Sequence, residues 1–208
     1  MAQLDLEYAV ALEDHRAAAD ALCMLARVAL RDGDLAAVTA RAKEAWSIAE
    51  DLHDQRLERM PIHLLAVAAR MAGRLTESRE LYLHSIALNE ALGEARMAAA
   101  EHRNLAYVEL HAGDIERARG LVAEARARNV NLDYPALDAY LLLDDAVLAA
   151  ADGAYAASAQ LLGRATESWR DLGVVLDPDD AAELATLRHT LTARLGKEAL
   201  GKVADLAE

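Results

Sequence analysis

The sequence has no phenylalanine, three prolines and a single cysteine, Cys23. One cysteine excludes an internal disulfide, and with it the small secreted scaffolds that disulfides hold together. The first residues, MAQLDLEYAV, lack the basic start and the apolar stretch of a signal peptide. No apolar run approaches the roughly 18 residues that are needed to cross a bilayer. We therefore expect a cytoplasmic protein.

Basic residues are also few, because 22 Lys and Arg stand against 35 Asp and Glu, which gives a formal net charge of −13. Affinity for nucleic acid is built mainly from clustered Lys and Arg. Anionic membrane surfaces attract the same residues. We therefore expect this chain to bind neither nucleic acid by itself nor a membrane.

The motifs of common catalytic sites are missing. The glycines are isolated, not gathered in a phosphate-binding GxGxxG or GxxxxGK loop, and no histidine pair has the HExxH spacing. Cys23 has no histidine partner at a spacing suited to zinc, and it is interpreted as a structural thiol. The acidic runs 144–145 and 177–180 are interpreted as capping and solvated residues. We predict no enzymatic activity, no metal site and no cofactor.

What the sequence does contain is alanine and leucine, within a hydrophobic fraction of 54%. Both residues are strong helix formers because they lose little side-chain freedom in a helix. A hydrophobic fraction of this size also supports a folded core. The composition predicts an all-helical protein whose helices pack closely through small side chains.

The glycines reveal an internal repeat. Four of them lie 40 residues apart, in similar contexts: Gly33, Gly73, Gly113 and Gly153. Seven positions before each glycine stands an alanine: Ala26, Ala66, Ala106 and Ala146. Two positions after each glycine stands a bulky apolar residue: Leu35, Leu75, Ile115 and Tyr155. Twelve positions after it stands a small residue: Ala45, Ser85, Ala125 and Ala165. Nineteen positions after it stands a leucine: Leu52, Leu92, Leu132 and Leu172. Five aligned columns in four blocks indicate one supersecondary unit that is repeated.

Each block is predicted to form a helix, a tight turn and a second helix. In the first block, apolar residues recur at helical spacing and predict one buried face: Leu22, Leu25, Ala26, Val28 and Ala29. Gly33 supplies the backbone freedom that is needed just past a helix end. Asp34 and, 80 residues later, Asp114 are expected to cap the second helices. Since one block cannot bury its apolar stripe alone, neighbouring blocks must stack.

This spacing of small, glycine, apolar and small residues resembles the tetratricopeptide repeat in its 40-residue variety. The segment ALGEARMAAAEHRNLAYVELHAGDIERA at 91–118 is similar to such a repeat. LRHTLTARLGKEAL at 187–200 resembles the closing element of the arrays in large bacterial ATP-dependent transcriptional regulators of the maltose-regulator and antibiotic-regulator kind. The resemblance implies an all-α, right-handed α-solenoid of antiparallel helix pairs over residues 1–173, with units at about 14–53, 54–93, 94–133 and 134–173.

The two ends of the array differ from its repeats. Residues 1–13 resemble the second half of a preceding unit, either because the chain was cut from a longer protein, which we favour, or because the half-repeat is a native cap. Residues 174–208 are predicted to form capping helices. The first, at about 178–195, begins with Pro178 after Asp177 and has a leucine stripe at 184, 187, 191 and 195. A short last helix is expected at 197–207.

The resemblance also implies a binding groove, because the first helix of each tetratricopeptide pair lines the concave side of the stack. The polar candidates in this groove are Arg27, Arg31, His63, Arg70, Arg103, Asn104, Tyr107, His111 and Tyr140. A guanidinium offers a planar fork for a carboxylate or phosphate, which predicts an anionic ligand. Alternatively, these arginines pair with acids of the neighbouring repeats.

Two kinds of function follow from these features. The first is a protein- or peptide-binding scaffold, as the interaction or sensor arm of a larger bacterial regulator. The second is a sensor for a small molecule such as a sugar or signalling peptide, with His63, Asn104, Tyr107 and Tyr140 as the contacts. Self-association into a homodimer through the N-terminal half-repeat is a third alternative.

Overall fold

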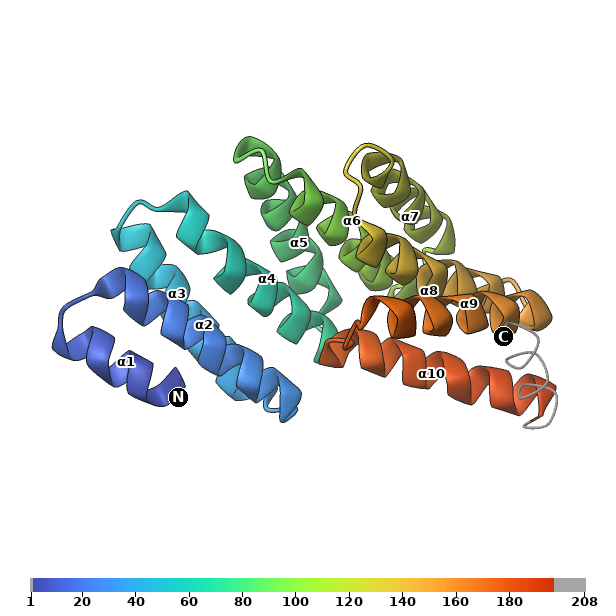
Figure 1. Ribbon diagram of the computed structural model, residues 1–208, viewed down its shortest axis with the longest axis horizontal. Coiled ribbons are helices and arrows are strands. Elements are labelled where there is room, and N and C mark those ends of the chain that lie inside the picture. The colour runs from blue at the N-terminus through green and yellow to red at the C-terminus, as the bar shows by residue number, and fades with distance from the viewer. Residues whose placement is uncertain (1, 197–208) are drawn as a thin grey trace. The chain divides into compact units, whose positions relative to one another are not determined.

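The computed structural model describes residues 2–196, and every element of regular secondary structure in that range is an α-helix (Figure 1). The helices of this range are α1 (Ala2–Ala11), α2 (His15–Arg31), α3 (Leu35–Asp51), α4 (Gln55–Met71), α5 (Leu75–Ala91), α6 (Ala95–His111), α7 (Ile115–Asn129), α8 (Pro135–Ala151), α9 (Tyr155–Leu172) and α10 (Pro178–Leu195). The predicted all-α class is confirmed. The helix expected at 197–207 lies outside the described residues. Within 2–196, no helix is both long and apolar enough to span a membrane.

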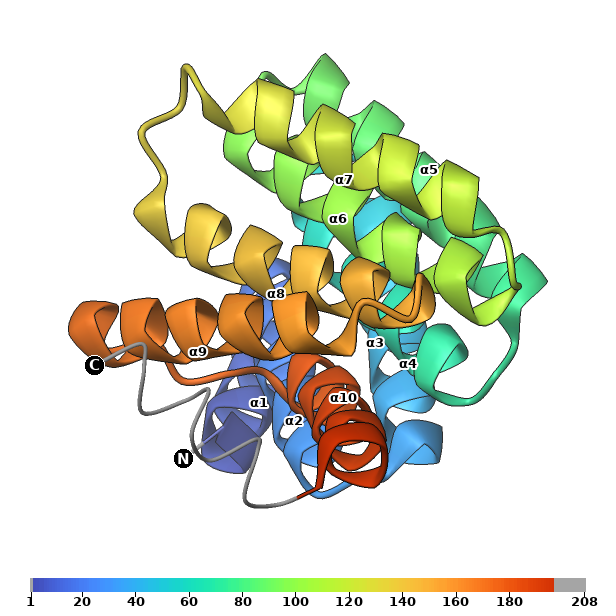
Figure 2. The same ribbon diagram turned by 90° about the vertical axis from the view of Figure 1, so that its right-hand side faces the viewer.

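The chain divides into two compact units, with the boundary between Glu101 and His102 inside α6. In the first unit, α1, α2, α3 and α4 each pack on the next helix in the chain, and α2 also packs on α4. In the second unit, α7 packs on α8, α8 packs on α9, and α10 packs on both α8 and α9 (Figure 2). This sequential packing is consistent with a helical repeat array.

The four periodic glycines occupy equivalent bends, as the sequence predicts. Each lies two residues after the end of a helix and has a positive φ: +75° at Gly33, +73° at Gly73, +85° at Gly113 and +78° at Gly153. A Cβ built at any of them would meet nothing within 4 Å. The bend therefore requires glycine for its left-handed backbone and not for lack of space.

The residues of the two small columns are buried. Alanines seven positions before the turn glycines are at most 1% exposed: Ala26, Ala66, Ala106 and Ala146. Residues of the second small column are fully buried: Ala45, Ser85, Ala125 and Ala165. Buried serines of the second helices donate to the carbonyls of two column alanines, Ser78 to Ala66 at 2.9 Å and Ser158 to Ala146 at 2.6 Å. The predicted close approach of the paired helices is confirmed.

Aspartates cap α3 and α7, two of the four helices that follow the turn glycines. The side chain of Asp34 accepts a hydrogen bond from the backbone N–H of Ala37, and Asp114 accepts one from Arg117, which confirms both predicted caps. Asp177 stands at the N-cap of α10 with Pro178 in the first turn, although its side chain makes no cap hydrogen bond. Short polar side chains at this position satisfy N–H groups that have no partner within the helix.

The predicted apolar faces are correct with one exception. Val28, which we expected on the buried face of α2, is 50% exposed. It lies one turn after Met24 and one turn before Arg31, on the side of the helix opposite to Leu22, Ala26 and Ala29. In α10, the leucine stripe packs on α8 and α9 as predicted, with Leu184, Leu187 and Leu191 buried and Leu195 partly buried.

Candidate functional site

The residues expected in the groove fall into two groups, one in each unit. On the first helices of the first unit lie Arg27, Arg31, His63 and Arg70. On α6 and α8 of the second unit lie Arg103, Asn104, Tyr107, His111 and Tyr140. Their surroundings differ strongly, because some are buried in internal ion pairs and others face solvent. We take the buried cluster of the second unit first.

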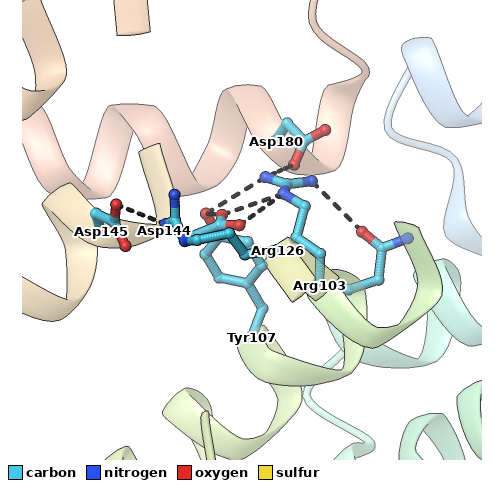
Figure 3. A network of polar contacts seen from close by, with 7 residues as sticks. Arg103, Tyr107, Arg126, Asp144, Asp145 and Asp180 are labelled. Carbon is cyan, nitrogen blue, oxygen red and sulfur yellow. Dashed lines mark hydrogen bonds and ion pairs between the residues drawn. The ribbon is translucent and has the colours of Figure 1, made fainter. Parts of the chain in front are cut away.

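Arg103 is the centre of a buried polar cluster (Figure 3). Its Nε atom donates to both carboxylate oxygens of Asp144, at 3.1 and 3.0 Å. The Nη2 atom lies 2.7 Å from Oδ1 of Asp180. The hydroxyl of Tyr107 donates to Oδ1 of Asp144 at 2.7 Å. One arginine of α6 therefore binds an acid of α8 and an acid of α10.

Aromatic rings enclose the same guanidinium. Its carbon lies 4.7 Å from the ring centroid of Tyr140 and 5.2 Å from that of Tyr107. Tyr140 also packs against Trp169 of α9, with the ring centroids 6.0 Å apart. Such cation–π contacts strengthen when water is excluded. Since the side chain of Arg103 is only 5% exposed, it serves as an internal tie of the second unit.

The cluster contains one guanidinium and two carboxylates, so it has an excess of negative charge. Burial raises the pKa of Asp144 to about 6, although Arg103 and the hydrogen bond from Tyr107 oppose this shift. Burial works to lower the pKa of Arg103, but Asp144 and Asp180 outweigh it and hold that pKa well above the ordinary value. Burial and, to a smaller extent, the negative charge of Asp180 raise the pKa of Tyr140 to about 12. Arg103 therefore stays charged, and Asp144 takes up a proton as the pH falls below about 6.

Two further arginines of the second unit bind acids across α7 and α8. Arg126 donates to Asp145 at 2.7 Å, and Arg119 donates to Asp152 at 3.0 Å. A cavity of about 220 Å³ lies between these ion pairs, with Val122, Leu148 and two alanines in its lining.

Asp144 and Asp145 point in different directions, so α8 is tied to both α6 and α7. The interpretation of this acidic run as capping and solvated is wrong for Asp144, which is 1% exposed.

The acidic run at the start of α10 is also partly internal. Asp179 and Asp180 are each 6% exposed, whereas they were expected to be solvated. On the same helix, a carboxylate oxygen of Glu183 lies 3.1 Å from Nε2 of His111, another groove candidate. Of the two predicted groove residues with partners on α10, Arg103 is buried and the side chain of His111 is 41% exposed.

In the first unit, His63 lies beside a buried acid. Its Nδ1 atom is 2.9 Å from Oε1 of Glu101, and Ser85 donates to the same oxygen at 2.9 Å. The side chain of Glu101 is 1% exposed and that of His63 is 26% exposed. Arg70 is itself buried, at 2% exposure. The alternative that these arginines pair with acids of the neighbouring repeats therefore holds for Arg103, and His63 makes a similar contact with an acid of the next repeat.

Arg27 and Arg31 are the exposed arginines among the predicted groove residues. They lie on one face of α2 with three other exposed residues, and this face, the α2 stripe, comprises Asp20, Met24, Arg27, Val28 and Arg31. Met24 and Val28 are each 50% exposed. Arg27 makes no ion pair with any residue in the described range 2–196. Cys23 lies beside the stripe but is buried, and burial, then Asp20, raise its pKa to about 12.

The partners of the buried arginine were missed from the sequence, although the repeat period offered a signal. Asp144 follows Arg103 by 41 residues, close to one repeat. Two surface pairs of the first unit show a similar spacing, since Arg16 binds Asp54 and Arg56 binds Glu94, each 38 residues on. A search for acids about one period after each arginine would have found these pairs.

No family model matches the chain, and no curated protein matches it either. Among solved structures, it is similar to the crystal structure of BtubC (BKLC) from P. vanneervenii. The two are 22% identical, the match covers 99% of this chain and 86% of that chain, and the TM-score is 0.70. At this identity the likeness shows a shared fold. No group of three or more His, Cys, Asp and Glu that could hold a metal ion occurs within the described part of the chain.

Proposed function

We propose that this protein is a binding scaffold for another protein or a peptide, built on helical repeats of the tetratricopeptide kind. The α2 stripe is the observation that carries the proposal. It places two large apolar side chains, Met24 and Val28, in solvent one helical turn apart. On α4, Met60 stands 40 residues after Asp20 of the stripe and is 38% exposed. Methionine adapts its shape to a partner, which suits such a surface.

The rigid support of the α2 stripe favours the same function. The opposite side of α2 is packed, with Leu22, Ala26 and Ala29 buried. Neighbouring helices α1, α3 and α4 all contact α2. A partner that docks on the stripe would meet a preformed surface and would not have to order a loop, which lowers the entropic cost of binding.

The alternative of a small-molecule sensor has less support. Two of its expected contacts, Asn104 and Tyr107, lie in the buried cluster around Arg103, at 8% and 1% exposure. His63 is bound to Glu101. The sequence resemblance to the arrays of large bacterial regulators supports a role as an interaction arm of such a protein, whose partner would then be a protein segment.

Affinity capture with a matched pair of variants tests the proposal. Met24→Glu with Val28→Glu places charge on the apolar part of the α2 stripe. Leu52→Glu with Leu83→Glu makes the same change at residues that are 42% and 46% exposed elsewhere in the first unit. We expect a protein from an extract of the source cells to be retained by the wild type and the control, and lost by the stripe variant. Equal retention by both variants would contradict the proposal.

A further inference from the structure

The α2 stripe has a defined order of charged and apolar groups. Met24 and Val28 are one turn apart, and so are Arg27 and Arg31, so the two pairs form adjacent rows on one helix face. Asp20 stands at the N-terminal end, seven residues or about 10 Å before Arg27. The stripe is therefore apolar along its middle, positive toward its C-terminal end and negative at its start.

This pair of positive charges lies in a chain whose net charge is −13. Other arginines at the starts of the first helices are engaged with acids of the next repeat, as in the pairs Arg16–Asp54 and Arg56–Glu94. Arg103, in the middle of α6, is buried between two carboxylates. Arg27 instead reaches solvent with no ion-pair partner among residues 2–196. A carboxylate on a docked segment would be the natural partner for its planar fork.

We infer that the α2 stripe binds an acidic, apolar segment of another protein, with an apolar pair over Met24 and Val28 and a carboxylate on Arg27. This inference rests on the proposed scaffold function and adds the chemistry of the partner. Asp20 sets the direction of the segment, because the acidic end of a partner is repelled from the start of α2 and attracted to its end. A helical segment with two apolar residues one turn apart and an acid beside them meets these requirements.

A random 16-residue peptide display library, selected on the immobilised full chain, tests this chemistry without a known partner. We expect enriched peptides to be acidic and to contain apolar pairs at helical spacing. The best peptide is then measured by fluorescence anisotropy in its natural form and with its Glu and Asp changed to Gln and Asn. We expect the neutral form to bind about tenfold more weakly, which corresponds to the loss of one charged hydrogen bond.

Two double variants with the same change in net charge locate the effect. Arg27→Glu with Arg31→Glu alters the stripe, and Arg164→Glu with Arg188→Glu alters two exposed arginines of the second unit. We expect the first to weaken the acidic peptide at least tenfold and the second to leave its Kd within twofold. Circular dichroism and thermal melts serve as the control that each variant is folded.

Several outcomes would overturn the inference. These are enrichment of neutral or basic peptides, no enrichment over the Arg27→Glu/Arg31→Glu variant, and an equal loss in the control variant. Self-association of the chain that Arg27→Glu/Arg31→Glu abolishes would show instead that a second copy occupies the stripe. If Met24→Glu/Val28→Glu weakens the peptide and the arginine variant does not, the scaffold proposal stands and the acidic partner is rejected.

Discussion

Arg103 and Asp144 lie 41 positions apart, and the guanidinium of the first donates to both oxygens of the second in a buried site. With Asp180, this contact ties α6, α8 and α10 of the second unit together. A charge pair that is taken out of water is stabilising only when its remaining polar atoms are also bonded. Tyr107 donates to Asp144, and Asp180 lies 2.7 Å from the guanidinium, so we interpret the cluster as a structural feature of the unit.

Removal of the guanidinium is expected to be costly. Arg103→Met leaves two carboxylates buried without their common partner, and we predict a loss of about 3–5 kcal/mol in the free energy of unfolding. Urea denaturation followed by circular dichroism measures this loss. Arg188→Met, at an exposed arginine of α10, is the control and should stay within about 0.5 kcal/mol. A loss below about 1 kcal/mol for Arg103→Met would show that the cluster does not stabilise the fold.

The raised pKa of Asp144 predicts a dependence of stability on pH. In the folded protein this pKa is about 6, above its ordinary value of 3.8, so between these values the folded state binds more protons than the unfolded state. The contribution of Asp144 to the free energy of unfolding therefore falls as the pH rises from about 4 to 6, by roughly 2–3 kcal/mol, and is flat above that.

Asp144→Asn removes this pH-dependent contribution to the free energy of unfolding, because the asparagine side chain does not titrate. We expect the difference in unfolding free energy between the wild type and Asp144→Asn to shift in favour of the variant as the pH rises from 4 to 6. Chemical denaturation at half-unit pH intervals measures the difference. A difference that is constant across this range would mean that Asp144 titrates as an ordinary carboxyl group.

The turn glycines are predicted to be sensitive for a backbone reason alone. Gly113→Ala should cost about 1–2 kcal/mol, because φ is +85° there although a Cβ has free space. Gly120 lies in the helix α7, also with free space, and Gly120→Ala should stabilise by about 0.5–1 kcal/mol. Thermal melts of both variants compare the two positions. The account of the turns is wrong if the two substitutions have the same sign.

The small columns are predicted to reject larger side chains. Ala66→Leu should cost about 3 kcal/mol or more, since Ala66 is fully buried at a close contact between paired helices. Ala87→Leu, at an exposed position of α5 in the same unit, should be near neutral. Denaturant midpoints distinguish the two outcomes. A tolerated Ala66→Leu would mean that the paired helices do not depend on close approach.

Much of the fold could be predicted from the sequence because the repeat encodes it locally. The glycine bends, the small columns and the caps at Asp34 and Asp114 each depend on a few residues at fixed spacing, and each recurs. The leucine stripe of α10 could be predicted for the same reason. The tertiary contacts of single side chains were harder to predict from the sequence. Arg103, for example, is buried against Asp180 of α10, which lies outside the repeats.

The candidate site could likewise be predicted only in part from the sequence. All nine predicted groove residues lie on the first helices or on their equivalents, but the sequence could not tell which of them face solvent. Arg70 and Arg103 are buried, whereas Arg27 and Arg31 are exposed. Val28 was placed on the wrong face because it is apolar, and burial of an apolar residue is a tendency and not a rule. Its exposure beside Met24 became visible only in the structure.

Photo-crosslinking from the α2 stripe detects a protein that docks there. A crosslinking amino acid at position 28 is compared in living source cells with the same amino acid at position 83, an exposed leucine of α5 in the wild type. We expect a discrete protein adduct from position 28 that is absent from position 83 and is lost when Met24→Glu is added. Adducts from position 83 alone, or from neither position, would contradict the claim that this stripe binds a protein partner.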